Sequence, residues 1–251
     1  MSRNDRMAAR LLQIIGAWGV IITSAVSVIV FSTESDADKR AILGMGISLI
    51  VIWCIFGGIL MRLFRDRIVA AVKSIRINWK IRFVLFCIVL AMLEEAVTTS
   101  LTNAAPLFGA VSDAARITAS RNYLEVVLFH SVIAFVPMFI CWAWLLDRYA
   151  FSPVEVLLLF GLNGTLAETL SFGPQNLLQV GMWTFVYGLM VYLPAHTVPP
   201  NRDARTPGSR HWLLAAFLPL VFIVPLACWI AWKLILQIYR TIAHMKLNSR
   251  G

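Results

Sequence analysis

Long apolar windows separated by short polar stretches dominate this chain, and they predict most of its fold. About 20 apolar residues in a helix cross the hydrocarbon core of a bilayer. Seven windows approach or exceed that length, at residues 11–31, 41–63, 81–103, 123–146, 153–172, 177–193 and 212–232. The last window runs longer than one crossing and contains Pro219 and Pro225, which we expect to kink it. We therefore predict an all-α, polytopic transmembrane helical bundle of about seven spans, with six to eight allowed.

The composition supports a single integral membrane domain over residues 1–251. Only 14% of the residues are charged and 59% are hydrophobic, whereas soluble domains carry roughly 25% charged residues. No internal repeat divides the chain. The four cysteines, at positions 54, 87, 141 and 228, fall inside apolar windows without paired spacing, so we interpret them as core residues that form neither disulfides nor a metal site.

The charges between the windows predict an orientation in the cell membrane. Residues 32–39 hold three acidic side chains and one lysine, whereas residues 62–82 hold seven basic side chains and one aspartate. Positive charge favours the cytoplasmic side, which places the N-terminus and residues 62–82 there. Apolar residues recur at helical spacing within 62–82, so we expect an amphipathic interfacial helix on anionic lipid headgroups. The net charge of +9 is then explained by lipid and orientation, without nucleic acid.

Three connections complete the predicted topology. Residues 104–121 form a non-cytoplasmic loop that is long enough to fold back as a cap. Ser152, Pro153 and Glu155 form a helix start with a capping box, which gives Glu155 a structural role, and the helix should stop at Gly173. The basic tail at 233–251 would lie outside after seven full spans, against the charge rule. Either the fifth or the sixth segment does not cross fully, or the last one doubles back.

Two adjacent carboxylates, Glu94 and Glu95, lie in the middle of the 81–103 window. A charged or protonatable group at that depth costs at least a few kcal/mol, and it normally faces the interior of the bundle with a partner. If the pair has a structural role only, it belongs to a polar core that fixes helix register. If it has a functional role, it belongs to a catalytic or binding site.

The depths of the polar residues favour one site. The third and fifth spans should run outward and the fourth inward. Counting at about 1.5 Å per residue, Glu95, His130 and Asn163 lie roughly 10–14 Å below the outer boundary. Glu168 is slightly above them, and Thr98 and Thr99 share a helix face with the glutamates. We therefore predict that three consecutive spans contribute to a single polar site.

Two carboxylates and an imidazole in a low dielectric can form a general-base system. One glutamate can hold a proton while the other accepts a proton from water. Adjacent helical residues point about 100° apart, so only one of Glu94 and Glu95 can aim directly at that water. His130 and Asn163 can donate hydrogen bonds to an oxyanion. We assign Glu94, Glu95, His130 and Asn163 as catalytic candidates and Thr98, Thr99 and Glu168 as substrate-binding candidates.

The order Glu-Glu, His, Asn over three successive spans resembles the glutamic intramembrane proteases, the family of CAAX-prenyl proteases and bacteriocin-processing enzymes. The resemblance covers about 70 residues, from Glu94 to Asn163. It implies that Glu94 or Glu95 is the base, His130 its partner and Asn163 the oxyanion donor. The sequence departs from the family motifs at three positions, where the family has Arg, Phe and His and this chain has Thr99, Val126 and Leu159.

The leading hypothesis is thus a membrane-embedded hydrolase, a peptidase without metal or other cofactor, that acts on a membrane protein or peptide. A proton- or cation-coupled transporter would use the same carboxylates to carry charge. A metal site of Glu94, Glu95, His130 and Glu168 is a third hypothesis, because carboxylates and imidazole suit several divalent ions. In a fourth, an assembly or scaffold subunit, the polar cluster only joins helices.

Overall fold

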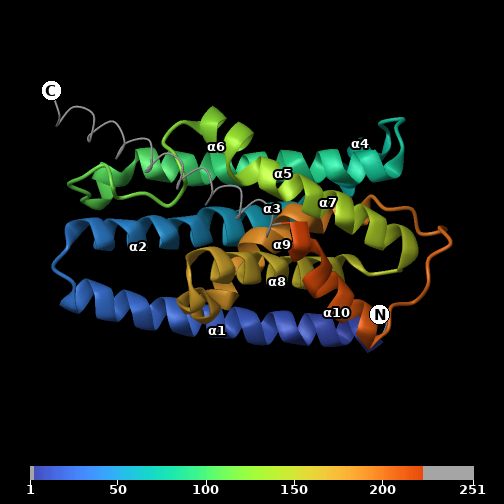
Figure 1. Ribbon diagram of the computed structural model, residues 1–251, viewed down its shortest axis with the longest axis horizontal. Coiled ribbons are helices and arrows are strands. Elements are labelled where there is room, and N and C mark those ends of the chain that lie inside the picture. The colour runs from blue at the N-terminus through green and yellow to red at the C-terminus, as the bar shows by residue number, and fades with distance from the viewer. Residues whose placement is uncertain (1–2, 223–251) are drawn as a thin grey trace, which may run out of the picture.

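The computed structural model describes residues 3–222, and within them the protein is an all-α bundle whose long helices run along one common axis (Figure 1). No strand forms in this part of the chain. In chain order the elements are α1 (Arg3–Thr33), α2 (Ala37–Leu49), the π-helix η1 (Ile50–Gly57), α3 (Gly58–Leu63), α4 (Arg65–Lys73), α5 (Trp79–Asn103), η2 (Ala105–Phe108), α6 (Tyr123–Phe129), α7 (Ser131–Arg148), α8 (Pro153–Phe172), η3 (Pro174–Gln179), α9 (Val180–His196), α10 (Ser209–Phe217) and η4 (Leu218–Phe222).

Five helical segments within residues 3–222 are long and apolar enough to cross a membrane. They are Arg3–Thr33, Ala37–Leu63, Tyr123–Arg148, Pro153–Phe172 and Pro174–His196. The predicted all-α helical bundle is therefore confirmed, and its five long apolar helices are compatible with a multi-pass membrane protein, but seven spans are not confirmed. The predicted third span is helix α5, which is not among the five. The predicted seventh span is described only as far as Phe222, and the rest of it and the basic tail at 233–251 lie outside the described residues.

The two ends of the bundle carry different charges. The N-terminus and α4 lie at one end, and the turn between α1 and α2 lies at the other (Figure 1). At the first end, Lys80 pairs with Asp147 at 2.7 Å. At the second end, the backbone N–H of Val111 donates to Asp38 Oδ1 at 2.8 Å, which fastens the 104–121 loop to the start of α2. The basic and acidic segments identified in the sequence therefore occupy opposite ends of the molecule.

Helices α8 and α9 pack so closely that glycines line their contact. A Cβ atom added at Gly161 would lie 2.2 Å from the backbone oxygen of Thr184, and one added at Gly188 would lie 2.7 Å from the backbone oxygen of Leu157. Small residues permit this approach, and such contacts replace the missing hydrophobic drive between helices in lipid. Both ends of α8 match their predictions. The capping box of Ser152 and Glu155 is present, and the helix ends before Gly173, whose φ is +107°.

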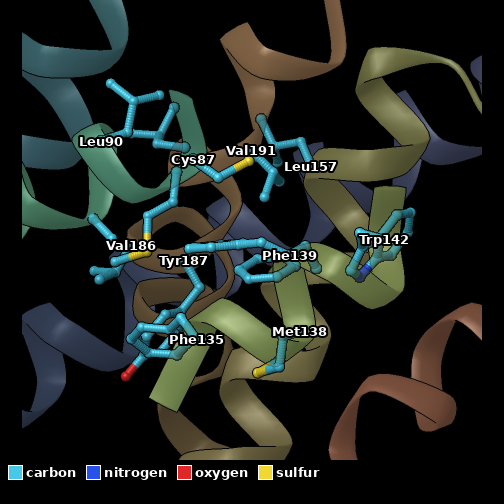
Figure 2. Close-up of a cluster of buried hydrophobic side chains, with 14 of the residues drawn as sticks. Cys87, Leu90, Phe135, Met138, Phe139, Trp142, Leu157, Val186, Tyr187 and Val191 are labelled. Carbon is cyan, nitrogen blue, oxygen red and sulfur yellow. The ribbon is translucent and has the colours of Figure 1, made fainter. Parts of the chain in front are cut away.

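A cluster of buried aromatic and aliphatic side chains joins α5, α7, α8 and α9 (Figure 2). The rings of Phe139 and Phe160 stack with centroids 5.4 Å apart, and the ring of Phe135 lies 5.3 Å from that of Tyr187. Offset and tilted aromatic pairs of this kind add to the energy of burial alone. Free thiols of Cys87 and Cys141 are buried in the same region, as expected for apolar core residues. The cluster fixes the four helices that carry the polar site.

Candidate functional site

A cavity of about 830 Å³ opens beside the aromatic cluster. Its walls come from α1, α2, α5, α7, α8 and α9, and residues 116–119 of the 104–121 loop cover part of it, as the length of that loop suggested. Most of the lining is apolar. The acidic part of the wall consists of three of the predicted site residues, Glu94, Glu95 and Glu168. A cavity of this size is in the range that binds small organic ligands, roughly 300–1,000 Å³.

Two threonine hydroxyls hold the carboxylate of Glu95. Thr98, one turn later on α5, donates to Glu95 Oε2 at 3.0 Å, and Thr118 of the covering loop donates to the same oxygen at 3.2 Å. Glu95 is only 6% exposed, so these two donors compensate part of the cost of burying the carboxylate. Thr98 was predicted as a site residue from its helix face, and it lines the cavity beside Glu95.

Glu94 differs from Glu95 in that its carboxylate has no hydrogen-bond partner within residues 3–222. Its side chain is 5% exposed and lines the cavity, yet no hydrogen bond or ion pair from any residue in 3–222 reaches its carboxylate. An unpaired polar group in a low-dielectric interior is costly. Such a group is retained where something else, a water molecule or a ligand, completes its hydrogen bonding.

The third carboxylate, Glu168 on α8, accepts a hydrogen bond from the hydroxyl of Tyr187 on α9. Tyr187 is 8% exposed and lines the cavity through its ring. Its neighbour Trp183, one turn earlier on α9, also lines the cavity, and the two rings stack with centroids 5.8 Å apart. The acidic wall therefore continues directly into an aromatic wall.

His130 lies where the predicted fourth span breaks. The backbone of His130 leaves the helical region with φ −127° and ψ −100°, so the span consists of α6 and α7 instead of one continuous helix. The ring lines the cavity, and its Nε2 is 3.8 Å from Glu125 Oε1. Within residues 3–222 it makes no hydrogen bond to Glu94 or Glu95. The structure thus brings His130 to the predicted cavity without forming the predicted Glu–His pair.

Asn163 and Thr99 do not line the cavity. Asn163 is completely buried; its Oδ1 accepts from Trp142 Nε1 at 3.0 Å, and its Nδ2 donates to the backbone oxygens of Ala215 and Ala216. Every polar atom of that amide is used to join α8 to α7 and α10, so the geometry removes Asn163 from the set of oxyanion donors. The hydroxyl of Thr99 is buried without a partner in the described part of the chain.

The last part of the covering loop is fastened to the end of α5. Thr102 of α5 accepts a hydrogen bond from the backbone N–H of Ile117 at 3.2 Å, and Asn103 donates to the backbone oxygen of Arg121 at 3.1 Å. These contacts position Thr118 over Glu95. Sequence reasoning missed Thr118, because nothing in a loop sequence shows which hydroxyl will reach a carboxylate. It also missed Tyr187, although a tyrosine within an apolar span signals a buried hydroxyl that needs a partner.

The cavity lining includes two basic residues, Lys39 on α2 and Arg116 on the covering loop. Lys39 Nζ lies 3.0 Å from Glu34 Oε2. The backbone N–H of Asp36, with help from Lys39, lowers the pKa of Glu34, which keeps this carboxylate ionised beside the lysine. Lys39 is thus neutralised from outside the cavity.

The arrangement does not favour a metal centre. Within residues 3–222, no three His, Cys, Asp or Glu side chains are grouped so that they could hold a metal ion. The hypothesis of a metal site formed by Glu94, Glu95, His130 and Glu168 is therefore not supported by their geometry. The three carboxylates share one wall of a cavity, but they do not converge on one point.

No family model, no curated protein and no solved structure matches this chain. Functional inference therefore depends on the cavity and its residues.

Proposed function

We propose that this protein is a membrane-embedded hydrolase, in the cell membrane with its N-terminus in the cytoplasm, in which Glu94 activates a water molecule. The observation that supports the proposal is the carboxylate of Glu94, which no side chain within residues 3–222 hydrogen-bonds, which is 5% exposed and which faces a cavity large enough for water and a substrate. A general base must have a free acceptor that can reach the water proton. Among the three carboxylates of the wall, Glu94 meets that condition.

The residues around the cavity suggest a separate role for each of Glu94, Glu95 and His130 in the reaction. Glu94 takes a proton from water, and the oxygen attacks an acyl carbon. When the carbon–nitrogen or carbon–oxygen bond of the tetrahedral intermediate breaks, Glu94 returns that proton to the leaving group. Glu95, held by Thr98 and Thr118, orients the water and keeps the wall acidic. His130, which lines the same cavity, can donate to the carbonyl oxygen.

A peptide bond in or near the membrane is the substrate that fits best. The lining from α1 and α2 is apolar, which suits a segment that enters from lipid. The resemblance to glutamic intramembrane proteases also points to a peptide bond. The residues that support this resemblance are now Glu94, Glu95 and His130, because Asn163 does not line the cavity. No cofactor is required by this chemistry. We also infer that the basic residues around α4 bind anionic headgroups, since α4 has no buried residue.

A proton- or cation-coupled transporter is the second candidate. The observation that favours it is that His130 makes no hydrogen bond to Glu94 or Glu95 within residues 3–222, whereas three carboxylates line one cavity. Intramembrane carboxylates of this kind also mark ion and proton pathways. The two candidates differ in one respect: only the hydrolase forms a new carboxylate from substrate.

The test compares the wild-type protein with Glu94→Gln in producing cells, with Asp66→Asn as a matched control at the exposed surface of α4. Both changes neutralise one carboxylate. We expect new peptide termini in membranes that contain wild type or the control, and at least about a 100-fold decrease with Glu94→Gln, the usual scale for loss of a general base. The measurement is mass spectrometry of peptides from membranes that are isolated from these cells and then incubated in H₂¹⁸O, which labels the carboxylates formed during the incubation.

Equal peptide profiles for the wild type and Glu94→Gln would contradict hydrolysis. In that event, wild-type proteoliposomes that acidify in response to a cation gradient, where Glu94→Gln proteoliposomes do not, would support the transporter.

A further inference from the structure

We propose that the cavity binds an organic ammonium cation that carries apolar substituents. The inference goes beyond hydrolysis, because it concerns what the cavity recognises and holds whichever reaction Glu94 performs. Three features support it: a buried carboxylate that has no partner within residues 3–222, a pair of stacked aromatic rings beside it, and a largely apolar remainder of the lining that fits hydrocarbon.

The three carboxylates of the cavity differ in the hydrogen bonds that they accept. Glu95 accepts hydrogen bonds from two hydroxyls and Glu168 accepts one from Tyr187, whereas Glu94 has none from residues 3–222. A buried carboxylate without a partner is unfavourable until a counter-charge reaches it. A cation in the cavity would supply that counter-charge to Glu94 and would also interact with the two carboxylates beside it.

The aromatic feature indicates which kind of cation. Trp183 and Tyr187 stack at 5.8 Å with their planes 28° apart, and the ring of Phe135 lies 5.3 Å from that of Tyr187. Figure 2 shows Phe135 beside Tyr187. All three residues line the cavity. Aromatic faces attract alkylated ammonium groups, and tryptophan does so most strongly. A small, strongly hydrated ion would gain little from such a wall.

The rest of the cavity suits the substituents. Apolar side chains of α1 and α2 also line the cavity, including Ile22, Val26 and Ile42. At about 830 Å³, the space is far larger than a bare ion needs and accommodates an organic molecule. The cationic residues do not cancel the acidic wall, because Lys39 already pairs with Glu34 and Arg116 belongs to the exposed covering loop.

The test measures binding of tetrapentylammonium to the full-length protein in nanodiscs of phosphatidylglycerol, by isothermal titration calorimetry. We expect Glu94→Gln to weaken binding at least about tenfold, as removal of one partner of a buried charge pair does. The control Asp66→Asn should bind like wild type. A second pair isolates the rings: Trp183→Leu should weaken binding about 2- to 30-fold, and Trp183→Phe, which keeps an aromatic face, should weaken it less.

The natural ligand could come from an aminolipid headgroup or from a free lipophilic amine, and a change in the lipid of the nanodiscs distinguishes these two sources. If the natural ligand is the headgroup of an aminolipid, nanodiscs that contain phosphatidylethanolamine will weaken tetrapentylammonium binding to wild type by competition. If it is a free lipophilic amine, the lipid change will have no effect. Both results support the proposal.

Equal binding by wild type and a correctly folded Glu94→Gln variant would overturn the proposal, and so would the absence of any binding by wild type. Because this readout needs no turnover, it can succeed where the test of hydrolysis fails, and it can fail where that test succeeds.

Discussion

Asn163 shows how a buried amide can serve structure alone. Its carbonyl accepts from Trp142, and its NH₂ group donates to two backbone oxygens of α10. We predict that Asn163→Ala destabilises the protein, because each buried polar group left unpaired costs about 1–3 kcal/mol. Thermal unfolding in nanodiscs measures this, with the exposed Asn201→Ala as control. Peptide cleavage per folded molecule should stay near wild type, and its loss in a stably folded Asn163→Ala variant would restore Asn163 to the site.

The same residue marks what the sequence can predict about a site. Depth along each span follows from residue counting, and it brought Glu94, Glu95, Glu168 and His130 correctly to one cavity. The direction of a side chain around its helix depends on which neighbours that helix packs against, and apolar windows do not show those neighbours. Asn163 therefore matched in depth but faces α7 and α10.

At the scale of elements, the backbones of α1 and α9 approach each other closely at one point. Ala8 is the only buried residue of α1. A Cβ atom added at Gly181 would lie 2.2 Å from the Cα of Gly19, so the two backbones touch. We predict that Gly181→Ala separates α1 from α9 and costs about 1–3 kcal/mol, as overpacking does. Because α1 forms part of the cavity wall, tetrapentylammonium binding should weaken as well.

Gly46→Ala on α2 is the matched control for this substitution, since a Cβ atom there meets nothing within 4 Å. Its stability should equal or slightly exceed that of the wild type, because alanine favours a helix more than glycine does. Chemical denaturation in detergent compares the variants. A Gly181→Ala protein as stable as the control would show that α1 is not held by this contact.

Element boundaries were predictable where local chemistry defines them. Ser152, Pro153 and Glu155 start α8 as expected, and Gly173 adopts the positive φ that ends it. The break at His130 was not predicted, since residues 123–146 contain no glycine and their one proline, Pro137, lies inside α7. A break without a local helix breaker must come from packing, and discontinuous helices within membranes occur where they line a cavity.

At the scale of the molecule, charge segregates along the long axis. The basic segment around α4 and the arginines of the N-terminus share one end, and Glu34, Asp36 and Asp38 lie at the other (Figure 1). This separation was predictable, because alternate connections of a helical bundle meet at the same end. The number of spans was not predictable in the same way. Helix α5, which carries Glu94 and Glu95, is not among the five helices that are long and apolar enough to cross, and the last apolar window is described only as far as Phe222.

This segregation leads to a prediction about orientation. Basic residues are retained on the cytoplasmic side, so the end with α4 should face the cytoplasm and the covering loop should face outward. Ile75, which follows α4, and Val111 of the loop are both exposed, at 51% and 82%. In a protein whose four native cysteines are replaced by alanine, we expect Val111→Cys to react with a membrane-impermeant maleimide in intact cells. Ile75→Cys should react only after the membrane is opened.

Gel shifts after labelling provide the measurement, and labelling of both variants in detergent is the control for reactivity. The opposite pattern would mean that the protein has the reverse orientation in the membrane, with the covering loop at the cytoplasmic side. Labelling of both positions in intact cells would mean that the segment between them, residues 76–110, which contains α5, does not cross the bilayer. Since Glu94 and Glu95 lie on that helix, the result would also move the candidate base out of the lipid-buried layer.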